Sequence, residues 1–282
     1  KAVFVWAGDH GVVAQGVSAF PQEVTQQMVL NFINGGAAIN VLARHAGADV
    51  FVIDAGVAQP VEHPQVISLN VKRGTNDFTF GPAMSRHEAE TAVLNGIKLA
   101  TAKIKAGYNV IATGDMGIGN TTPSTAIVAA LSGQPVEKLT GYGTGITAAA
   151  RAKKVEVIKK ALEINKPNSN DALDVLAKVG GLEIAGICGT ILGAAINKRP
   201  VIVDGLISAA GALVAARLAP KAVWYMFASH ASVEPSHKIA LNEIGLAPML
   251  FMDMRLGEGT GAVLALPLLE AAVKIINEMA TF

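Results

Sequence analysis

Cysteines, charged residues and aromatic residues are scarce in this chain of 282 residues. The one cysteine, Cys188, cannot form a disulfide within the chain, which suits a reducing cytoplasm, and we expect it to be a small buried apolar group. Charged residues make up 16% of the chain, the net charge is +1, and Lys and Arg form no basic block. A nucleic acid or an acidic membrane surface would need such a block, so we expect small molecules as partners.

Long hydrophobic runs are also missing, although 51% of the residues are hydrophobic. The longest apolar stretches, Leu206–Ala216 and Ile184–Ile196, fall short of the roughly 20 residues that a membrane-spanning helix needs. We therefore expect buried helices and no membrane span. Glycines along Ile184–Ile196 permit close packing, and we favour the core over a subunit interface for this helix.

The six histidines form no recognised metal-binding pattern. His230 and His237 flank Glu234, but the motif His-Glu-x-x-His is absent and Pro235 interrupts any helix face between them. These two histidines are therefore expected to have loop or capping roles, and His10 a structural one. We predict no metal ion and no other cofactor.

The chain does contain short apolar runs that alternate with long helical patterns. The runs expected to form buried strands are Val3–Trp6, Val50–Ile53, Asn109–Ala112, Val201–Val203, Val223–Phe227 and Met249–Met252. Strands that alternate with helices imply a parallel sheet with right-handed crossovers. The expected fold class is α/β, a mostly parallel sheet flanked by helices.

Long helices are expected over Ser85–Ala106, Thr147–Asn165 and Ala262–Ala280, where apolar residues recur at the helical period. No linker or repeat divides the chain. Residues 1–261 are therefore expected to form one catalytic domain, and residues 262–282 a terminal helix that packs in a small helical subdomain. The chain starts inside a strand pattern without an initiator Met, so we expect further sequence upstream.

Carboxylates beside glycines follow the expected strands one after another. They are Asp9, Asp54, Asp115, Asp204 and Glu258. A single Asp-Gly pair is usually only a turn, but carboxylates repeated at the ends of parallel strands meet at the edge where such sheets hold ligands. They can bind Mg²⁺, bind ribose hydroxyls or transfer protons, and their position alone leaves these alternatives open.

Two glycine-rich loops have the composition of phosphate-binding loops. Gly117–Thr122 leads into a helix expected near Pro123, and Gly141–Gly145 precedes the helix that carries Lys153 and Lys154. Backbone N–H groups at a helix N-terminus attract a phosphate dianion, and a lysine can neutralise it. Neither loop is a Walker A loop or a dinucleotide fingerprint. Lys153 is expected to lie on a solvated helix face.

Longer motifs occur in a fixed order along nearly the whole chain. They are Gly8–Val12, Gly16–Ser18, Glu23–Thr25, Gly35–Asn40, Gly114–Thr122, Lys178–Gly181, Val203–Gly205, Ser229–His230 and Arg255–Gly261. The set resembles the nicotinate-nucleotide:dimethylbenzimidazole phosphoribosyltransferase family. The resemblance implies a Rossmann-like sheet with a small helical domain, usually a homodimer. It also implies metal-independent transfer of 5-phosphoribose from nicotinate mononucleotide to 5,6-dimethylbenzimidazole, giving nicotinate and α-ribazole 5′-phosphate for the lower ligand of cobalamin.

The resemblance assigns roles to individual residues as well. Glu258, in the Arg-Leu-Gly-Glu-Gly motif, is the expected proton acceptor. The expected substrate-binding residues, of which Asp204 is inferred from strand position alone, are Phe20, Gln27, Asp115, Met116, Gly117, Ile118, Gly119, Asn120, Gly143, Thr144, Gly145, Lys154, Asp204, Ser232 and Leu256. The loops and Lys154 would hold the phosphate. Phe20, Gln27, Met116 and Leu256 would form the benzimidazole pocket.

Two departures from the family pattern are visible. Asp115 lies where the family often has Glu, which shortens a side chain close to the ribose or base, and the family's N-terminal segment is absent from this chain. Without the resemblance, the same residues also fit a non-catalytic nucleotide-binding protein or a Mg²⁺-dependent phosphohydrolase. The preferred aromatic base stays open.

Overall fold

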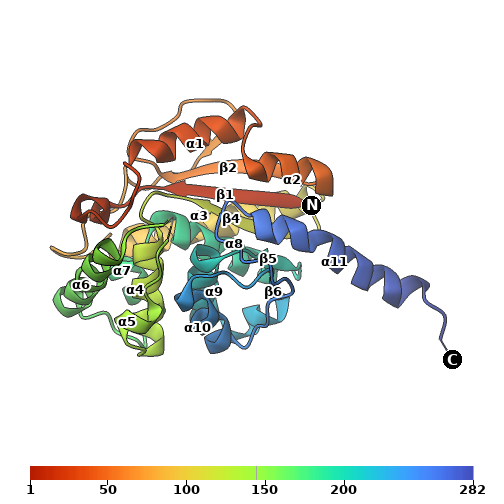
Figure 1. Cartoon of the computed structure of the whole chain (residues 1–282). Coiled ribbons are helices and arrows are strands. Elements are labelled where there is room, and N and C mark those ends of the chain that lie inside the picture. The colour runs from red at the N-terminus through yellow and green to blue at the C-terminus, as the bar shows by residue number, and fades with distance from the viewer. Residues whose placement is uncertain (144, 282) are drawn as a thin grey trace.

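The computed structural model describes residues 1–143 and 145–281, and its centre is a six-stranded parallel sheet (Figure 1). The strands are β1 (Ala2–Gly8), β2 (Asp49–Gly56), β3 (Val66–Ser68), β4 (Ile111–Met116), β5 (Val201–Val203) and β6 (Met226–Ala228), in the spatial order β3-β2-β1-β4-β5-β6. The predicted α/β class is confirmed. The strand order reverses between β1 and β4, and open sheets hold their ligands in the crevice at the carboxyl ends beside such a reversal.

Helices cover both faces of the sheet, which buries β1 along its whole length (Figure 1). One face packs against α1 (Glu23–Ile33), α2 (Ala38–Ala46) and α11 (Thr260–Glu278). The other packs against α8 (Leu182–Ile196) and α9 (Leu206–Leu218), with α3 (Arg86–Lys105) beside α8. Further out lie α4 (Thr121–Ser132), α5 (Val136–Leu139), α6 (Ala148–Asn165), α7 (Ala172–Val179), α10 (Pro235–Ile244) and two 3-10 helices, Gly11–Gln15 and Pro220–Tyr225.

The predicted long helices lie close to their expected limits. At the start of α3, the Ser85 hydroxyl accepts a hydrogen bond from the Glu88 N–H at 3.2 Å, and the Glu88 carboxylate accepts one from the Ser85 N–H at 2.7 Å. This capping box satisfies donors that the helix itself leaves unpaired. α6 ends at Asn165, and Lys166 then takes a positive φ of 42° ahead of Pro167.

α8 lies in the core, as predicted. A Cβ added at Gly186 would overlap the Trp6 ring, and one added at Gly189 would overlap the Val93 carbonyl oxygen of α3. Glycine at these positions therefore lets α8 approach both the sheet and α3. Cys188 is fully buried on the same helix, and burial raises the pKa of its thiol.

Some strand predictions need correction. Val223–Phe227 is not one strand, because a 3-10 helix that starts at Pro220 continues to Tyr225, and only Met226–Ala228 pairs with β5. β4 starts later than predicted and runs to Met116, so Asp115 lies within the strand. β3 was missed because it is a partly exposed edge strand whose apolar run is only Val66 and Ile67, whereas the equally short β5 is fully apolar and buried.

Met249–Met252 is not a strand either. Leu250 forms an isolated bridge with His230, and the chain then turns away. Pro248 precedes the segment and cannot donate to a ladder, and Asp253 after it takes a positive φ of 51°. The segment therefore adds an edge contact to the sheet without extending it.

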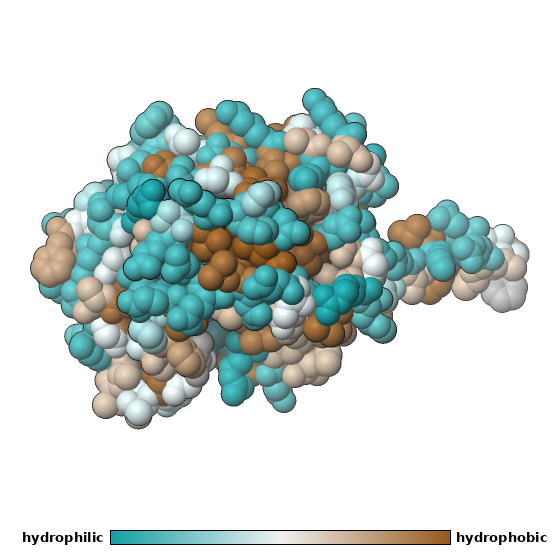
Figure 2. Space-filling model, turned by 90° about the horizontal axis from the view of Figure 1, so that it is seen from above, coloured by the Kyte–Doolittle hydropathy of each residue, from teal (hydrophilic) through white to brown (hydrophobic). Residues whose placement is uncertain are grey.

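α11 leaves the body of the molecule at its C-terminal half (Figure 1). Thr260–Val263 are buried, whereas apolar side chains farther along, such as Val273, Ile276 and Met279, are exposed. The projecting arm carries both hydrophobic and hydrophilic residues (Figure 2). Within the described residues, α11 alone is long and apolar enough to cross a membrane by length and composition, and 33% of its apolar window is buried.

Candidate active site

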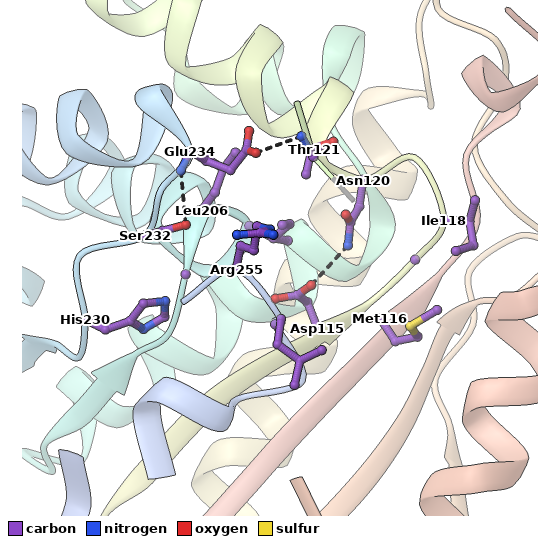
Figure 3. A pocket seen from close by; sticks show the side chains of 16 residues that line it. Asp115, Met116, Ile118, Asn120, Thr121, Leu206, His230, Ser232, Glu234 and Arg255 are labelled. Atoms are coloured by element: carbon purple, nitrogen blue, oxygen red, sulfur yellow. Dashed lines mark hydrogen bonds between the residues drawn. The ribbon is translucent and has the colours of Figure 1, made fainter. Parts of the chain in front are cut away.

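A pocket opens at the carboxyl ends of β4 and β5 (Figure 3). It brings together the predicted site residues Asp115, Met116, Gly117, Ile118, Asn120, Gly143, Ser232 and Leu256. Its remaining lining residues were not among the predicted ones: Thr121, Gly205, Leu206, Ile207, His230, Glu234, Arg255 and Gly257. The parallel sheet accounts for this grouping, because its strands all end at the same edge.

The two glycine-rich loops meet on one side of the pocket. Gly117–Asn120 leads into α4, and the hydroxyl of its first residue, Thr121, lies 2.6 Å from Lys154 Nζ. A Cβ built on Gly143 would lie 3.5 Å from Thr121 Oγ1 and 3.9 Å from Lys154 Nζ. Both loops and Lys154 line one small cavity. A helix N-terminus, backbone N–H groups and a cation thus converge, which is the arrangement that a phosphate site needs. We call this set, Gly117–Thr121 with Gly143 and Lys154, the phosphate cradle.

Lys154 contributes an ammonium group that is almost fully removed from water. Lys154 is 1% exposed. The neighbouring Lys153 is exposed, as predicted. Burial lowers the pKa of Lys154 to about 8, an effect that the nearby Glu234 carboxylate partly opposes. The lysine is therefore mainly charged at neutral pH, in a setting where an anionic ligand would be strongly attracted.

Asp115 places a buried carboxyl group in the wall of the pocket. Its Oδ2 accepts a hydrogen bond from Asn120 Nδ2 at 3.1 Å, and Oδ1 has no partner among the described residues (Figure 3). Burial, and then the carboxylates of Asp204 and Glu183, raise the pKa of Asp115 well above its usual value. These shifts favour the neutral acid, which can donate a hydrogen bond to a ligand, more than in an ordinary aspartate.

Glu258 lies beside the pocket, on the loop that precedes α11. The prediction that it follows a strand is wrong, because residues 249–252 form none and the Glu258 N–H is instead anchored to the Asp115 carbonyl oxygen of β4 at 3.2 Å. Its backbone takes a φ of 62°, a conformation that costs energy outside glycine and clusters at functional sites.

The Glu258 side chain is 7% exposed and reaches α2. Its Oε2 accepts a hydrogen bond from the Ile39 N–H at 3.1 Å, while Oε1 accepts none from the described residues. Burial raises the pKa of Glu258, and the Ile39 hydrogen bond partly opposes that rise. A carboxylate whose pKa is raised toward neutrality is a better proton acceptor.

Asp204 has a different environment from the one predicted. It is fully buried and does not line the pocket, and its carboxylate accepts hydrogen bonds from the Gly259 N–H at 3.1 Å and the Ala262 N–H at 2.9 Å. These contacts cap the start of α11. Burial raises the pKa of Asp204 to about 7. The geometry gives this residue a role in holding the loop that carries Glu258 against α11.

Other predicted residues lie away from the main pocket. Phe20 is 48% exposed and Gln27 of α1 is exposed, and neither lines it. Gly119 lines the cavity of the phosphate cradle, and Gly145 lines an adjoining hollow near Arg151. Thr144 lies outside the described residues.

His230, Glu234 and Arg255 are the ionisable side chains of the pocket that sequence reasoning missed. His230 was given a loop or capping role, yet it is buried and lines the pocket, and burial lowers its pKa. His237 does act locally, since its Nδ1 accepts from the Ser232 N–H at 3.2 Å. Arg255 lies in the same Arg-Leu-Gly-Glu-Gly motif as Glu258, so the sequence did offer a signal for it. Glu234 had none, because its loop joins the site only through tertiary structure.

No group of three or more His, Cys, Asp or Glu side chains is arranged to hold a metal ion in the part of the chain that the structure describes.

A Rossmann-like sheet with a phosphate cradle and buried carboxylates at its strand ends defines an α/β protein that binds a phosphorylated ligand. A family model described as "Phosphoribosyltransferase" matches residues 1–282. The chain belongs to this phosphoribosyltransferase family.

Similar proteins carry one name. A relative from Desulforamulus reducens is 60% identical over the whole chain and 81% of its own length, and one from Chloroflexus aggregans is 57% identical over the whole chain and 80% of its length. Both are called nicotinate-nucleotide–dimethylbenzimidazole phosphoribosyltransferase. A crystal structure of CobT from Thermus thermophilus superposes with a TM-score of 0.96 at 47% identity, covering 100% of this chain and 84% of that one. Sequence and fold thus agree on the family.

Proposed function

We propose that the protein transfers 5-phosphoribose from nicotinate mononucleotide to 5,6-dimethylbenzimidazole, releasing nicotinate and α-ribazole 5′-phosphate for cobalamin synthesis. The observation that carries the proposal is one pocket that combines a phosphate cradle with the buried carboxyl group of Asp115, next to the loop of Glu258. The names of relatives that are 60% and 57% identical support the choice of substrates.

In the proposed reaction, a ring nitrogen of the benzimidazole attacks C1′ of the ribose from the face opposite nicotinate. The bond between C1′ and the pyridinium nitrogen breaks, and its electron pair returns to that nitrogen, so nicotinate leaves without needing a proton. The attack makes the benzimidazole a cation that carries an N–H on its second nitrogen. Removal of this proton by Glu258 gives the neutral α-riboside product.

The remaining site residues would orient the reactants. The phosphate cradle would fix the 5′-phosphate and with it the ribose, which lowers the entropic part of the barrier. Met116 and Leu256 line the pocket and would contact the flat base. Phe20 and Gln27, which are exposed in this structure, would join them only if the α1 region moved toward the pocket on binding.

We also propose a homodimer and a cytoplasmic location. The outer half of α11 exposes apolar side chains, with Ile276 82% and Val273 52% exposed, and such a surface favours a partner. In this proposal residues 262–282 pack in a small helical subdomain and residues 1–261 form the catalytic domain. The single buried cysteine suits a reducing compartment.

The proposed activity is tested by incubating the protein with nicotinate mononucleotide and dimethylbenzimidazole, with and without excess EDTA, and separating the products. Equal amounts of nicotinate and α-ribazole phosphate, unchanged by EDTA, are expected. Binding of the nucleotide without turnover would point instead to a nucleotide-binding protein. Release of inorganic phosphate that EDTA abolishes would point to a Mg²⁺-dependent phosphohydrolase.

A further inference from the structure

The phosphate cradle already contains a negatively charged group, the carboxylate of Glu234. This residue is the N-cap of α10 and is 6% exposed. Its Oε1 accepts a hydrogen bond from the Gly143 N–H at 2.8 Å, one of the backbone donors expected to bind phosphate (Figure 3). Its Oε2 is buried and has no partner among the described residues. Glu234 also lies near enough to Lys154 to raise the pKa of that lysine.

The loop that supplies Gly143 is shaped around this carboxylate. A Cβ added at Gly141 would overlap Glu234 Oε2 and lie 2.6 Å from its Cδ. Any other residue at position 141 would therefore push the carboxylate or the loop away. Glu234 contacts the loop at two glycines and faces the cradle lysine, so its position is built into the fold.

A phosphate dianion and this carboxylate compete for the same partners. The Gly143 N–H can give its full hydrogen bond to only one of them, and two anions at neighbouring positions in a poorly hydrated pocket repel each other. A ligand's phosphate must therefore displace the Glu234 carboxylate or bind against its charge. In both cases, a small anion that makes no contacts beyond those of its own charge binds more weakly.

We propose that Glu234 is an internal anion that occupies the phosphate cradle of the free enzyme and excludes simple oxyanions from it. The inference rests on the proposed function, since it takes the cradle as the site of the nucleotide phosphate. A nucleotide adds contacts from its ribose and base and so overcomes the competition, whereas inorganic phosphate and sulfate do not. Glu234 is thus a specificity residue that acts by penalising the wrong ligand.

Sulfate is the probe that tests this inference, because it is a dianion at every pH of interest. Its dissociation constant is measured by calorimetry at pH 6.5, below the Lys154 pKa of about 8, for the wild type, Glu234→Gln and Lys154→Ala. The glutamine side chain keeps the size of the original and an oxygen for the Gly143 N–H, but lacks the charge. Glu234→Gln is expected to bind sulfate about tenfold more tightly, in line with one removed like-charge contact. Lys154→Ala is expected to bind it more weakly.

The enzymatic counterpart is inhibition by sulfate. For Glu234→Gln, the inhibition constant of sulfate against nicotinate mononucleotide should fall by a similar factor. Glu234→Ala should lower this constant too, and it serves as the second variant in case Glu234→Gln folds poorly. Unchanged sulfate binding in both Glu234 variants, with weaker binding in Lys154→Ala, would overturn the inference and leave the phosphate site standing. Unchanged binding in all three would overturn it as well and place the phosphate elsewhere. Weaker nucleotide binding in Glu234→Gln with unchanged sulfate binding would make Glu234 a ribose ligand and also overturn it.

Discussion

Single residues in this site owe their chemistry to removal from water. Lys154, Asp115 and Glu258 are each less than a tenth exposed, and burial shifts the pKa of every one of them toward the neutral form. A buried cation is costly without an anion, so Lys154 favours binding of a phosphate. The raised pKa of Glu258 improves it as a base. Burial thus suits Lys154 to the phosphate-binding role, and Glu258 to the proton-accepting role, that we propose for them.

Lys154 leads to a prediction about nucleotide binding. At pH 7, Lys154→Ala should weaken binding of nicotinate mononucleotide by about tenfold or more, because a charge-assisted hydrogen bond worth roughly 1.5–3 kcal/mol is lost. Binding of dimethylbenzimidazole should not change. In the wild type, nucleotide affinity should fall as the pH rises through about 8, where the free enzyme's lysine loses its proton. Calorimetric titrations from pH 6.5 to about 9.5 measure both effects.

Lys153 provides the matched control, since it is the neighbouring lysine on the same helix and is exposed. Lys153→Ala should bind the nucleotide like the wild type. Equal weakening by the two substitutions, or equal loss of affinity for the nucleotide and the base in Lys154→Ala, would return Lys154 to a structural role.

At the scale of elements, the loop that carries Glu258 is held by two helices and a strand. Its backbone is tied to β4 through Asp115, its carboxylate to the start of α2 through Ile39, and its end to α11 through Asp204. These anchors come from segments far apart in the sequence. The position of Glu258 therefore depends on the packing of α2 and α11 as well as on the sheet.

Asp204 gives a prediction about stability and pH. Its folded-state pKa, about 7, is raised above the usual value of 3.8, so its stabilising contribution is present at low pH and is lost as the pH rises toward 7. Asp204→Asn cannot ionise and lacks this loss. The destabilisation of Asp204→Asn relative to the wild type should therefore shrink between pH 5 and pH 8, by an amount on the order of 2 kcal/mol. Urea unfolding at the two pH values measures it.

If Asp204→Asn is destabilised by the same amount at both pH values, the pKa of Asp204 does not change on folding. Reduced turnover in Asp204→Asn with no change in stability at either pH would instead favour the direct contact with substrate that its strand position first suggested.

How much the sequence could predict also depends on the element. Long helices such as α3 carry their own signals, including the Ser85 cap, and the glycine-rich loops were placed correctly beside Lys154. The apolar composition of Met249–Met252 predicted a strand, but this segment forms only one bridge to the sheet. Glu234 was missed because its role depends on a loop 91 residues away in the chain. Such pairings arise from packing and leave no local pattern.

At the scale of the whole molecule, α11 stands out because its outer half exposes apolar side chains. Its first turns complete the core on one face of the sheet, while its last turns project from the body of the molecule (Figure 1) and expose apolar side chains to solvent. Exposed apolar surface of this kind favours association, and the proposed dimer would bury it.

Ile276→Asp tests the dimer, since it puts a charge on the most exposed of these apolar side chains. Light scattering should give a dimer mass for the wild type and a monomer mass for Ile276→Asp. Lys274→Glu, also on the exposed part of α11, controls for a charge change on this helix and should stay dimeric. A monomeric wild-type protein, or a dimer that survives Ile276→Asp, would remove α11 from the interface.

Glu258→Gln is the substitution that shows whether Glu258 accepts the proton of the attacking base, as we propose. The glutamine keeps an oxygen for the Ile39 N–H, so the fold should hold, but it cannot take up a proton. Turnover of nicotinate mononucleotide and dimethylbenzimidazole, measured beside the melting temperature and both substrate affinities, should fall by about 10²–10⁴ with the other quantities unchanged. Near-normal turnover would contradict the account and remove Glu258 as the base, and a loss of turnover that only follows a lower melting temperature would make its role structural.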